Sequence, residues 1–331
     1  MIKRALITSL ILSLVTAWAP AKSAPEKGAV FDFEKPPADQ TDLFVAATRG
    51  GNLKKISRIA IVNFTVEFMT GKGVSAKTHD GAKSSTIFLP ALDTEVAQGI
   101  ADRLYDQLVA DLGDMGLEVI PFETLKTSKN FAKLKGAQHE TPWQLDNPNS
   151  SSVFIGARGM PIYVDNPERL EGLQHGLGAS FGTNTRLHEV MLCNEFKGNL
   201  LSVNVVIDFA DTKTPRFFTN VDTSYAHYLP AKHTRYRFAA VGQPDFAWLA
   251  LSQRLESGNS PFVEVSSTEH KSVSIDETQT ETSKVTGISF DEALYLKDSE
   301  RMARAANALF MSAFARERGG PAPVSTGLPI K

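Results

Sequence analysis

The chain has 331 residues, of which 42% are hydrophobic and 22% charged, and its formal net charge is -2. This composition is typical of a folded protein with a sizeable core and excludes a disordered chain. The slightly acidic balance, without any basic run, argues against nucleic acid and anionic membrane surfaces as partners.

The first 21 residues have the features of a bacterial export signal. Two basic residues precede an apolar run over 5–19, and Ala19 and Ala21 fit the small-x-small rule for cleavage before Lys22. We therefore expect a signal peptide over 1–21, a periplasmic or secreted protein, and no transmembrane segment after the signal is removed. The alternative is a retained N-terminal anchor.

Cys193 is the only cysteine of the chain, so no internal disulfide can form. It lies in an apolar stretch without a basic neighbour that would lower the pKa of its thiol, which favours an inert buried thiol over a nucleophile. Because no cysteine follows the signal, we do not expect a lipoprotein.

The first part of the mature chain mixes irregular and regular segments. Residues 22–52 are rich in Pro, Gly, Lys and Asp and predict an irregular N-terminal arm, with a short ordered piece at 43–48. The β-branched run RIAIVNF predicts a strand over 58–64. Residues 70–90, rich in Gly, Ser, Thr and Lys, are interpreted as an inserted loop.

The clearest helix of the sequence begins near Asp93, a suitable N-cap. Apolar residues recur every four positions from Val96 to Leu112. A buried strand is predicted over 117–121, and a weaker helix over 123–134. This order of strand, helix, strand and helix favours a parallel α/β core, with α+β as the alternative.

Residues 138–198 are predicted to be a second insertion. Within it we expect strands at 153–155 and 162–164, and interpret 187–196 as a strand, although a helix is the alternative. Further along the chain, the sequence predicts long strands at 200–210, 217–228 and 235–241, and then a short helix at 245–255.

The C-terminal part begins with a segment in which polar residues dominate. Residues 262–288 alternate sparsely between apolar and polar, which predicts a solvated antiparallel hairpin. A helix is predicted over 298–318 and a disordered tail over 319–331. Residues 53–318 are thus expected to form a single globular domain.

Residues 71–78 resemble a phosphate-binding loop, but Ala76 replaces a required glycine and no helix follows. We interpret the segment as a flexible loop. A second motif, Gly178-Ala179-Ser180-Phe181-Gly182, satisfies the G-x-S-x-G pattern of serine hydrolases. The residues before it do not form a buried strand, so a Gly-rich loop is favoured, and Ser180 as a nucleophile stays an alternative.

Partners for Ser180 follow it in the order that a catalytic triad needs: an acid, either Asp208 or Asp222, and then a histidine. The candidate histidines are His227, His233 and His270. His227 and His233 also stand among tyrosines, but no further ligand completes a metal set, so we expect neither a metal nor a cofactor.

The aromatic segment 224–238 (SYAHYLPAKHTRYRF) has two interpretations. It is either a recognition surface, because Tyr and Arg are enriched at interfaces, or an edge strand with its rings turned inward. The edge strand is favoured.

Three runs of the sequence, RIAIVNF, LDTEVAQGIADRLYDQLVADL and GLEVIPFETLKT, resemble the start of the curli-secretion lipoprotein (CsgG-like) family and of the amino-terminal domain of the TolB translocation protein. The later run LLSVNVVIDFADTKT and the final helix also fit. The resemblance implies an exported α/β domain that binds envelope partners and oligomerises in some members, and it does not imply an enzyme. The absent lipobox and the insertions at 70–90 and 138–198 depart from the family.

We therefore predict an exported, non-enzymatic envelope protein that binds envelope proteins or itself, through 224–238 and 262–288. The alternatives are a serine hydrolase with Ser180 as nucleophile and a soluble periplasmic ligand-binding protein with its pocket under 138–198.

Overall fold

The computed structural model describes most of the chain from residue 29 onward. The described ranges are 29–48, 53–78, 81–134, 138–147, 150–163, 185–213, 222–273, 280–327 and 329–330. The predicted signal peptide and the Ser180 motif lie outside these described residues.

In these ranges, thirteen strands form one mixed sheet, and two further strands pair with each other. The main path through the sheet is β1-β12-β11-β9-β2-β3-β15-β14. Its strands are β1 (Val45–Thr48), β12 (Gln243–Leu251), β11 (Arg235–Ala240), β9 (Asn199–Lys213), β2 (Arg58–Thr78), β3 (Gly81–Phe88), β15 (Thr280–Phe290) and β14 (Phe262–Val273). Beside the path lie β4 (Glu118–Ile120), β6 (Trp143–Asn147), β7 (Ser150–Gly156), β10 (Asp222–Leu229) and β13 (Leu255–Glu256), and the separate pair is β5 (Gln138–His139) and β8 (Ile162–Tyr163).

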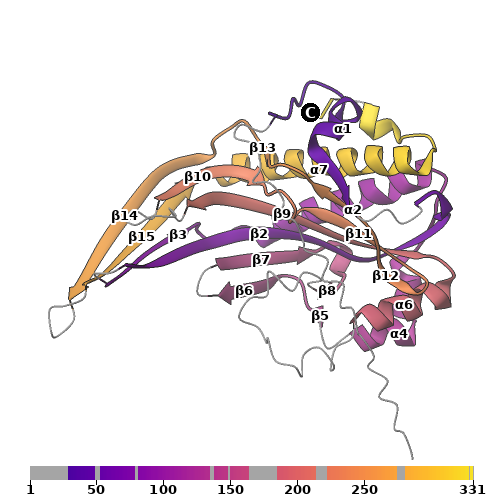
Figure 1. Ribbon diagram of the computed structural model, residues 1–331, viewed down its shortest axis with the longest axis horizontal. Coiled ribbons are helices and arrows are strands. Elements are labelled where there is room, and N and C mark those ends of the chain that lie inside the picture. The colour runs from indigo at the N-terminus through magenta and orange to yellow at the C-terminus, as the bar shows by residue number, and fades with distance from the viewer. Residues whose placement is uncertain are drawn as a thin grey trace, which may run out of the picture.

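Helices cover both faces of the body of this sheet (Figure 1). The long helices α2 (Thr94–Asp114) and α7 (Glu292–Arg318) lie on one face, and α4 (Lys129–Ala132) and α6 (Thr185–Phe196) lie on the other. The remaining helices are α1 (Pro37–Phe44), α3 (Phe122–Lys126) and the short 3-10 turns Leu53–Lys55, Ala157–Gly159 and Val324–Gly327. None of the helices in the described ranges has the length and apolarity needed to cross a membrane.

The mixed sheet with helices on both faces gives the chain an α/β fold, as its sequence predicted.

The centre of the body is the parallel pair of β2 and β9, in which Ile59 lies opposite Asn199 and Phe68 opposite Ile207. Residues 59–62 of β2 are fully buried, because helices cover both faces of the sheet here. A continuous apolar run is what such a strand requires, which explains why RIAIVNF was recognisable from the sequence.

The helix α2 begins and ends close to its predicted bounds, and Asp93 is its N-cap. The Asp93 carboxylate accepts hydrogen bonds from the backbone N–H groups of Glu95 and Val96. The helix runs alongside α7, to which it is joined by an ion pair between Arg103 and Glu300 at 2.6 Å.

Four predictions for single elements were wrong. Residues 187–196 belong to the helix α6, in which buried Glu189, Leu192 and Cys193 follow helical spacing. Residues 245–255 form most of β12 and the start of β13. β12 pairs with β1 along one edge and with β11 along the other, so its apolar residues do not recur with the period of a helix. The predicted helix over 123–134 is divided into α3 and α4, and Ser128 caps the second of them.

The predicted loop 70–90 was the fourth error, and it has the largest consequence. Residues 70–78 continue β2, and residues 81–88 form β3. Together with β14 and β15 they form an extension of the sheet that leaves the body and reaches the far left of Figure 1. We call residues 71–78 of β2 with β3, β14 and β15 the blade. The hairpin predicted over 262–288 is confirmed as β14 and β15.

Both ends of the described chain are more ordered than the sequence predicted. Part of the expected irregular arm forms α1 and β1, and Phe31 and Phe44 are buried. Residues 319–327 and 329–330 of the expected disordered tail pack on the body. The Ser325 hydroxyl donates to Asp111 at 2.7 Å, and the Ile330 N–H donates to the Phe33 carbonyl at 3.1 Å.

A buried ion pair joins α6 to the sheet. The Arg237 guanidinium on β11 donates two hydrogen bonds to the Glu189 carboxylate, at 3.0 and 2.5 Å, and both side chains are 1% exposed. Such a pair contributes little net stability, but the loss of one partner leaves a buried charge.

We expect Arg237→Met to lower the free energy of unfolding by about 3–5 kcal/mol, because Glu189 then keeps its charge in the core without the guanidinium. Urea denaturation followed by circular dichroism measures this loss. The double variant Arg237→Met/Glu189→Leu should regain most of it, and Arg103→Met, at an exposed ion pair, should cost less than about 1 kcal/mol. A loss below about 1 kcal/mol for Arg237→Met would contradict the prediction.

Candidate functional site

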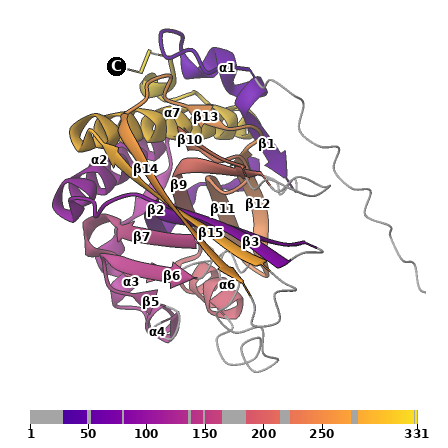
Figure 2. The same cartoon turned by 90° about the vertical axis from the view of Figure 1, so that its left-hand side faces the viewer.

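The blade begins where β2 exchanges one neighbour for another. Up to Phe68, β2 pairs with β9. From Gly71 onward the same edge of β2 pairs with β3, and β9 continues beside β10 instead. We call this point of divergence the fork. Figure 2, which faces the tip of the blade, shows β9 and β10 on one side of the blade and β7 on the other.

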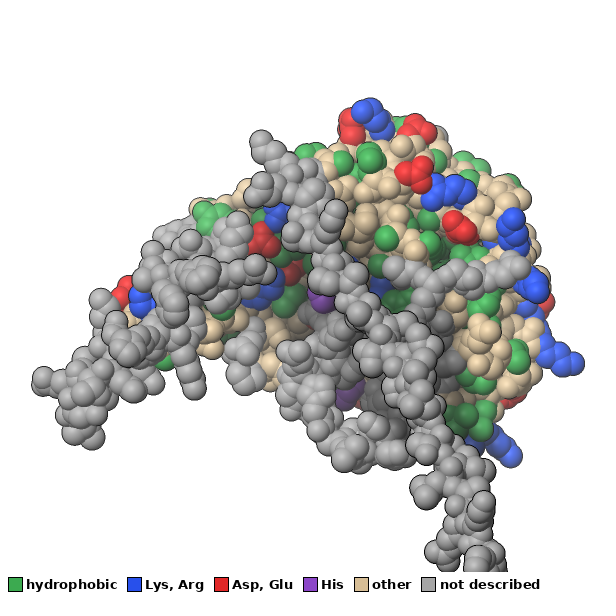
Figure 3. Space-filling view, in the orientation of Figure 1, with side chains coloured by type: hydrophobic (Ala, Val, Ile, Leu, Met, Phe, Trp, Pro, Cys, Tyr) green, Lys and Arg blue, Asp and Glu red, His purple; other side chains and the backbone are tan. Residues whose placement is uncertain are grey.

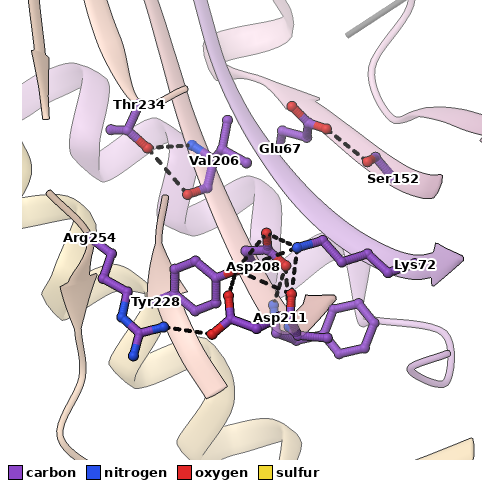
Figure 4. Close-up of polar contacts among 11 residues, drawn as sticks. Glu67, Lys72, Ser152, Val206, Asp208, Asp211, Tyr228, Thr234 and Arg254 are labelled. Carbon is purple, nitrogen blue, oxygen red and sulfur yellow. Dashed lines mark hydrogen bonds and ion pairs between the residues drawn. The ribbon is translucent and has the colours of Figure 1, made fainter. Parts of the chain in front are cut away.

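A group of charged and polar side chains spans the fork. The Lys72 amine on β2 donates to the Asp208 carboxylate on β9 at 2.6 Å, and also to the Ala210 carbonyl and the Tyr228 hydroxyl (Figure 4). The Asp208 carboxylate also accepts the backbone N–H of Phe209 at 2.8 Å. Lys72 therefore connects β2 to β9 and β10 where no backbone ladder does.

The same group continues to the surface. The Tyr228 hydroxyl on β10 donates to Asp211 at 2.8 Å, and the Arg254 guanidinium donates to the other oxygen of Asp211 at 2.6 Å. We call Lys72, Asp208, Asp211, Tyr228 and Arg254 the Lys72 cluster. Each of its two carboxylates has a cationic neighbour, because Asp208 pairs with Lys72 and Asp211 pairs with Arg254.

Burial and the two neighbouring carboxylates raise the pKa of Tyr228 well above its ordinary value. The phenol therefore stays neutral and acts as a hydrogen-bond donor at physiological pH. Because its cations and anions are paired with each other, the Lys72 cluster is suited to holding strands together.

Two further polar contacts lie nearby on the sheet: Ser152 donates to Glu67 at 2.8 Å, and the Thr234 hydroxyl bonds to the backbone of Val206 (Figure 4).

The sequence-predicted triad is not assembled from the described residues. Asp208 is paired with Lys72, and His227 lies on β10 against α7, where its Nε2 is 3.0 Å from the Ser299 hydroxyl and its ring stacks on Tyr295 at 4.3 Å. Asp222 is at the start of β10. Since Ser180 lies outside the described residues, its role as a nucleophile stays a prediction.

The remaining motifs have structural roles where they are described. Residues 71–78, which resemble a phosphate-binding loop, are a strand of the blade, so the prediction of a loop here was wrong. Cys193 is buried in α6, and burial raises the pKa of its thiol to about 12, as expected of an inert thiol. Among the described residues, no group of three or more His, Cys, Asp or Glu could hold a metal ion.

His227 is a buried neutral histidine. Burial lowers its pKa from the ordinary 6.5 to about 3. The unfolded chain therefore binds a proton below pH 6.5 that the folded chain does not accept until about pH 3, so falling pH favours unfolding across this window.

We expect the free energy of unfolding to include a His227 component that falls by up to about 1.4 kcal/mol per pH unit between pH 6.5 and pH 4. His227→Gln should lack this component, so its stability should fall less steeply with acid than that of the native chain. Urea denaturation at several pH values gives both slopes. Equal slopes would show that His227 takes up its proton in the folded state as readily as in the unfolded state.

The aromatic segment 224–238 is largely internal. Tyr228, Tyr236 and Phe238 are buried, and Tyr236 and Phe238 pack on Phe310 and Phe314 of α7. The favoured interpretation as an edge strand was wrong, because β11 lies between β9 and β12. Tyr225, close to the fork, is the large side chain of this segment that is clearly exposed in the described structure.

The blade presents the most accessible part of the sheet. In the described ranges, no strand pairs with the outer edge of β14, and residues 266–269 of this strand are exposed. Phe88 and Val285 are 42% and 40% exposed on the outer face of the blade. A hollow of about 480 Å³ beside them is lined by Pro90, Ser266 and residues 287–289, among others.

A second groove, of about 430 Å³, lies where α2 and α7 begin, and is lined by Val96, Ile100 and Leu296 with charges at its rim. Over the body, acidic and basic side chains are interspersed on the face seen in Figure 3.

Comparison with protein-family models, with curated proteins and with solved structures finds no match to this chain. The blade is thus the candidate functional site on geometry alone.

Proposed function

We propose that this chain is an exported, non-enzymatic protein of the bacterial cell envelope that binds other envelope components through its blade. The observation that carries the proposal is the open edge of β14, a strand of 12 residues at the end of a sheet that projects from the body. An open edge offers a row of backbone donors and acceptors to a partner strand.

The side chains of the blade support a role in water rather than in lipid. Ser, Thr, Lys and Glu make up most of β3, β14 and β15, while Phe88, Val263 and Val285 are exposed apolar side chains among them. Such a surface has apolar contact points within a polar frame, which is typical of protein interfaces that form from soluble partners.

The export signal predicted over 1–21 supports a place in the periplasm or outside the cell. The resemblance to the CsgG-like family agrees with the same proposal, because that family binds envelope partners. The element order implied by the resemblance (a strand, a helix, a second strand and a second helix) is found in β2, α2, β4 and α3, with β3 inserted between β2 and α2.

The proposal is tested by photo-cross-linking in the native cell envelope. A photoreactive amino acid is placed at Ser267 on β14 or at Val285 on β15, both exposed, and the tagged protein is purified and analysed by mass spectrometry. We expect a reproducible cross-linked partner, another envelope protein or a second copy, from both positions. Lys133, exposed beyond α4 on the body, is the matched control and should give none.

Equal capture from Lys133, or no capture from the blade, would overturn the proposal. A fluorophosphonate probe applied to the same purified protein decides the serine hydrolase alternative. Labelling that is lost in Ser180→Ala would replace the proposed function with hydrolysis, because the probe reacts with activated serine nucleophiles.

A further inference from the structure

The blade has an inner and an outer face, and the strand register separates them. Lys72 of β2 lies opposite Ile87 of β3, and Ile87 lies opposite Thr286 of β15. Two residues that lie directly opposite each other on neighbouring strands have side chains on the same face of the sheet. Along one strand, every second side chain is on the same face. Lys72, Ser85, Ile87 and Thr286 therefore share the inner face, whereas Phe88 and Val285 are on the outer face.

The chain itself covers the inner face near the fork. Lys72 projects from this face and reaches Asp208, Ala210 and Tyr228, so the face is turned toward β9 and β10. β10 lies against β3, and the Tyr225 ring contacts the Phe262 ring edge-on at 5.5 Å. Among the described residues, a charged cluster and a ring pair thus contribute to the contacts across the fork.

What is covered is in part polar. Ser85 and Thr286 are 3% and 5% exposed, and their hydroxyl oxygens have no hydrogen-bond partner among the residues that the structure describes. A buried hydroxyl without a partner is less stable than the same hydroxyl hydrogen-bonded to water. The covered arrangement therefore carries a penalty that an uncovered inner face, with both hydroxyls hydrated, would not carry.

We propose that β9 and β10 beyond the fork are a releasable internal cover of the inner face, held in place by the Lys72 cluster. Two opposed contributions define the device: the ion pair of Lys72 with Asp208 favours the covered state, and the unpartnered hydroxyls of Ser85 and Thr286 favour the uncovered state. Release turns the inner face from a covered surface into an accessible one without unfolding the body. The device goes beyond the proposed function, and its test needs no partner.

Thiol accessibility tests the proposal in the full-length protein. Ser85→Cys places a reporter on the inner face, and Ala303→Cys places a reference in the buried core of α7, at 1% exposure. The native Cys193 serves as an internal silent thiol, because burial raises its pKa to about 12. The rate of modification by a maleimide reports how often each site opens.

We expect Lys72→Met to raise the modification rate of the Ser85→Cys reporter by about 10- to 100-fold, the range for loss of a charge-assisted hydrogen bond, without changing the Ala303→Cys rate. Lys72→Arg, which keeps the charge, should stay close to the native rate. Arg103→Met breaks an ion pair of the same length away from the fork and should leave the Ser85→Cys rate unchanged.

Tyr228→Phe provides a milder variant in case Lys72→Met does not fold. It removes the hydroxyl that bonds to Asp208 and Asp211 and should raise the Ser85→Cys rate by a smaller factor. The proposal is overturned if neither variant raises this rate, or if the Ser85→Cys and Ala303→Cys rates rise together, since the latter shows global unfolding. The outcome of cross-linking from Ser267, which tests the proposed function, does not depend on either of these results.

Discussion

The fold depends on β2, a long strand whose two halves lie in different environments. The first half of β2 is buried between helices and pairs with β9, while its second half leaves the body and pairs with β3. At the change of neighbour, the backbone ladder between β2 and β9 ends after Phe68, although the two strands remain in contact. Lys72 makes that contact through side-chain hydrogen bonds to Asp208 and Tyr228 and the backbone carbonyl of Ala210, so the body and the blade meet at a charged joint.

Burial at this joint gives neighbouring residues different chemistry. His227 and Tyr228 follow each other on β10 and point to opposite faces, one toward Ser299 on α7 and the other toward Asp208 and Asp211. Burial lowers the pKa of the imidazole and raises that of the phenol, and both groups are thereby kept neutral. Asp208 and His227, two of the residues that the sequence offered as partners of Ser180, make contacts that hold strands and helices together.

The elements that could be predicted from sequence are those whose pattern reflects burial. RIAIVNF and the long strand over 200–210 were recognisable from their β-branched apolar runs, and the α2 helix with its Asp93 cap from the helical spacing of its apolar residues. The blade was half recognised: its β14 and β15 hairpin was predicted, but 70–90 was not, because a strand that is solvated over much of its surface has the composition of a loop. The Lys72 cluster had no local signal, since Lys72, Asp208 and Arg254 come together only when distant strands pair.

The pairings of β2 with β9 and of β3 with β15 also constrain how the chain acquires its structure. Ile59 must find Asn199, and Gly81 must find Thr280, so the ladders join segments that are far apart in the sequence. Contacts of such high sequence separation have a large loop-closure cost and are typical of slow folding. β3 has no second neighbour until β15 has been synthesised, so the blade cannot complete its sheet before the C-terminal part of the chain is present.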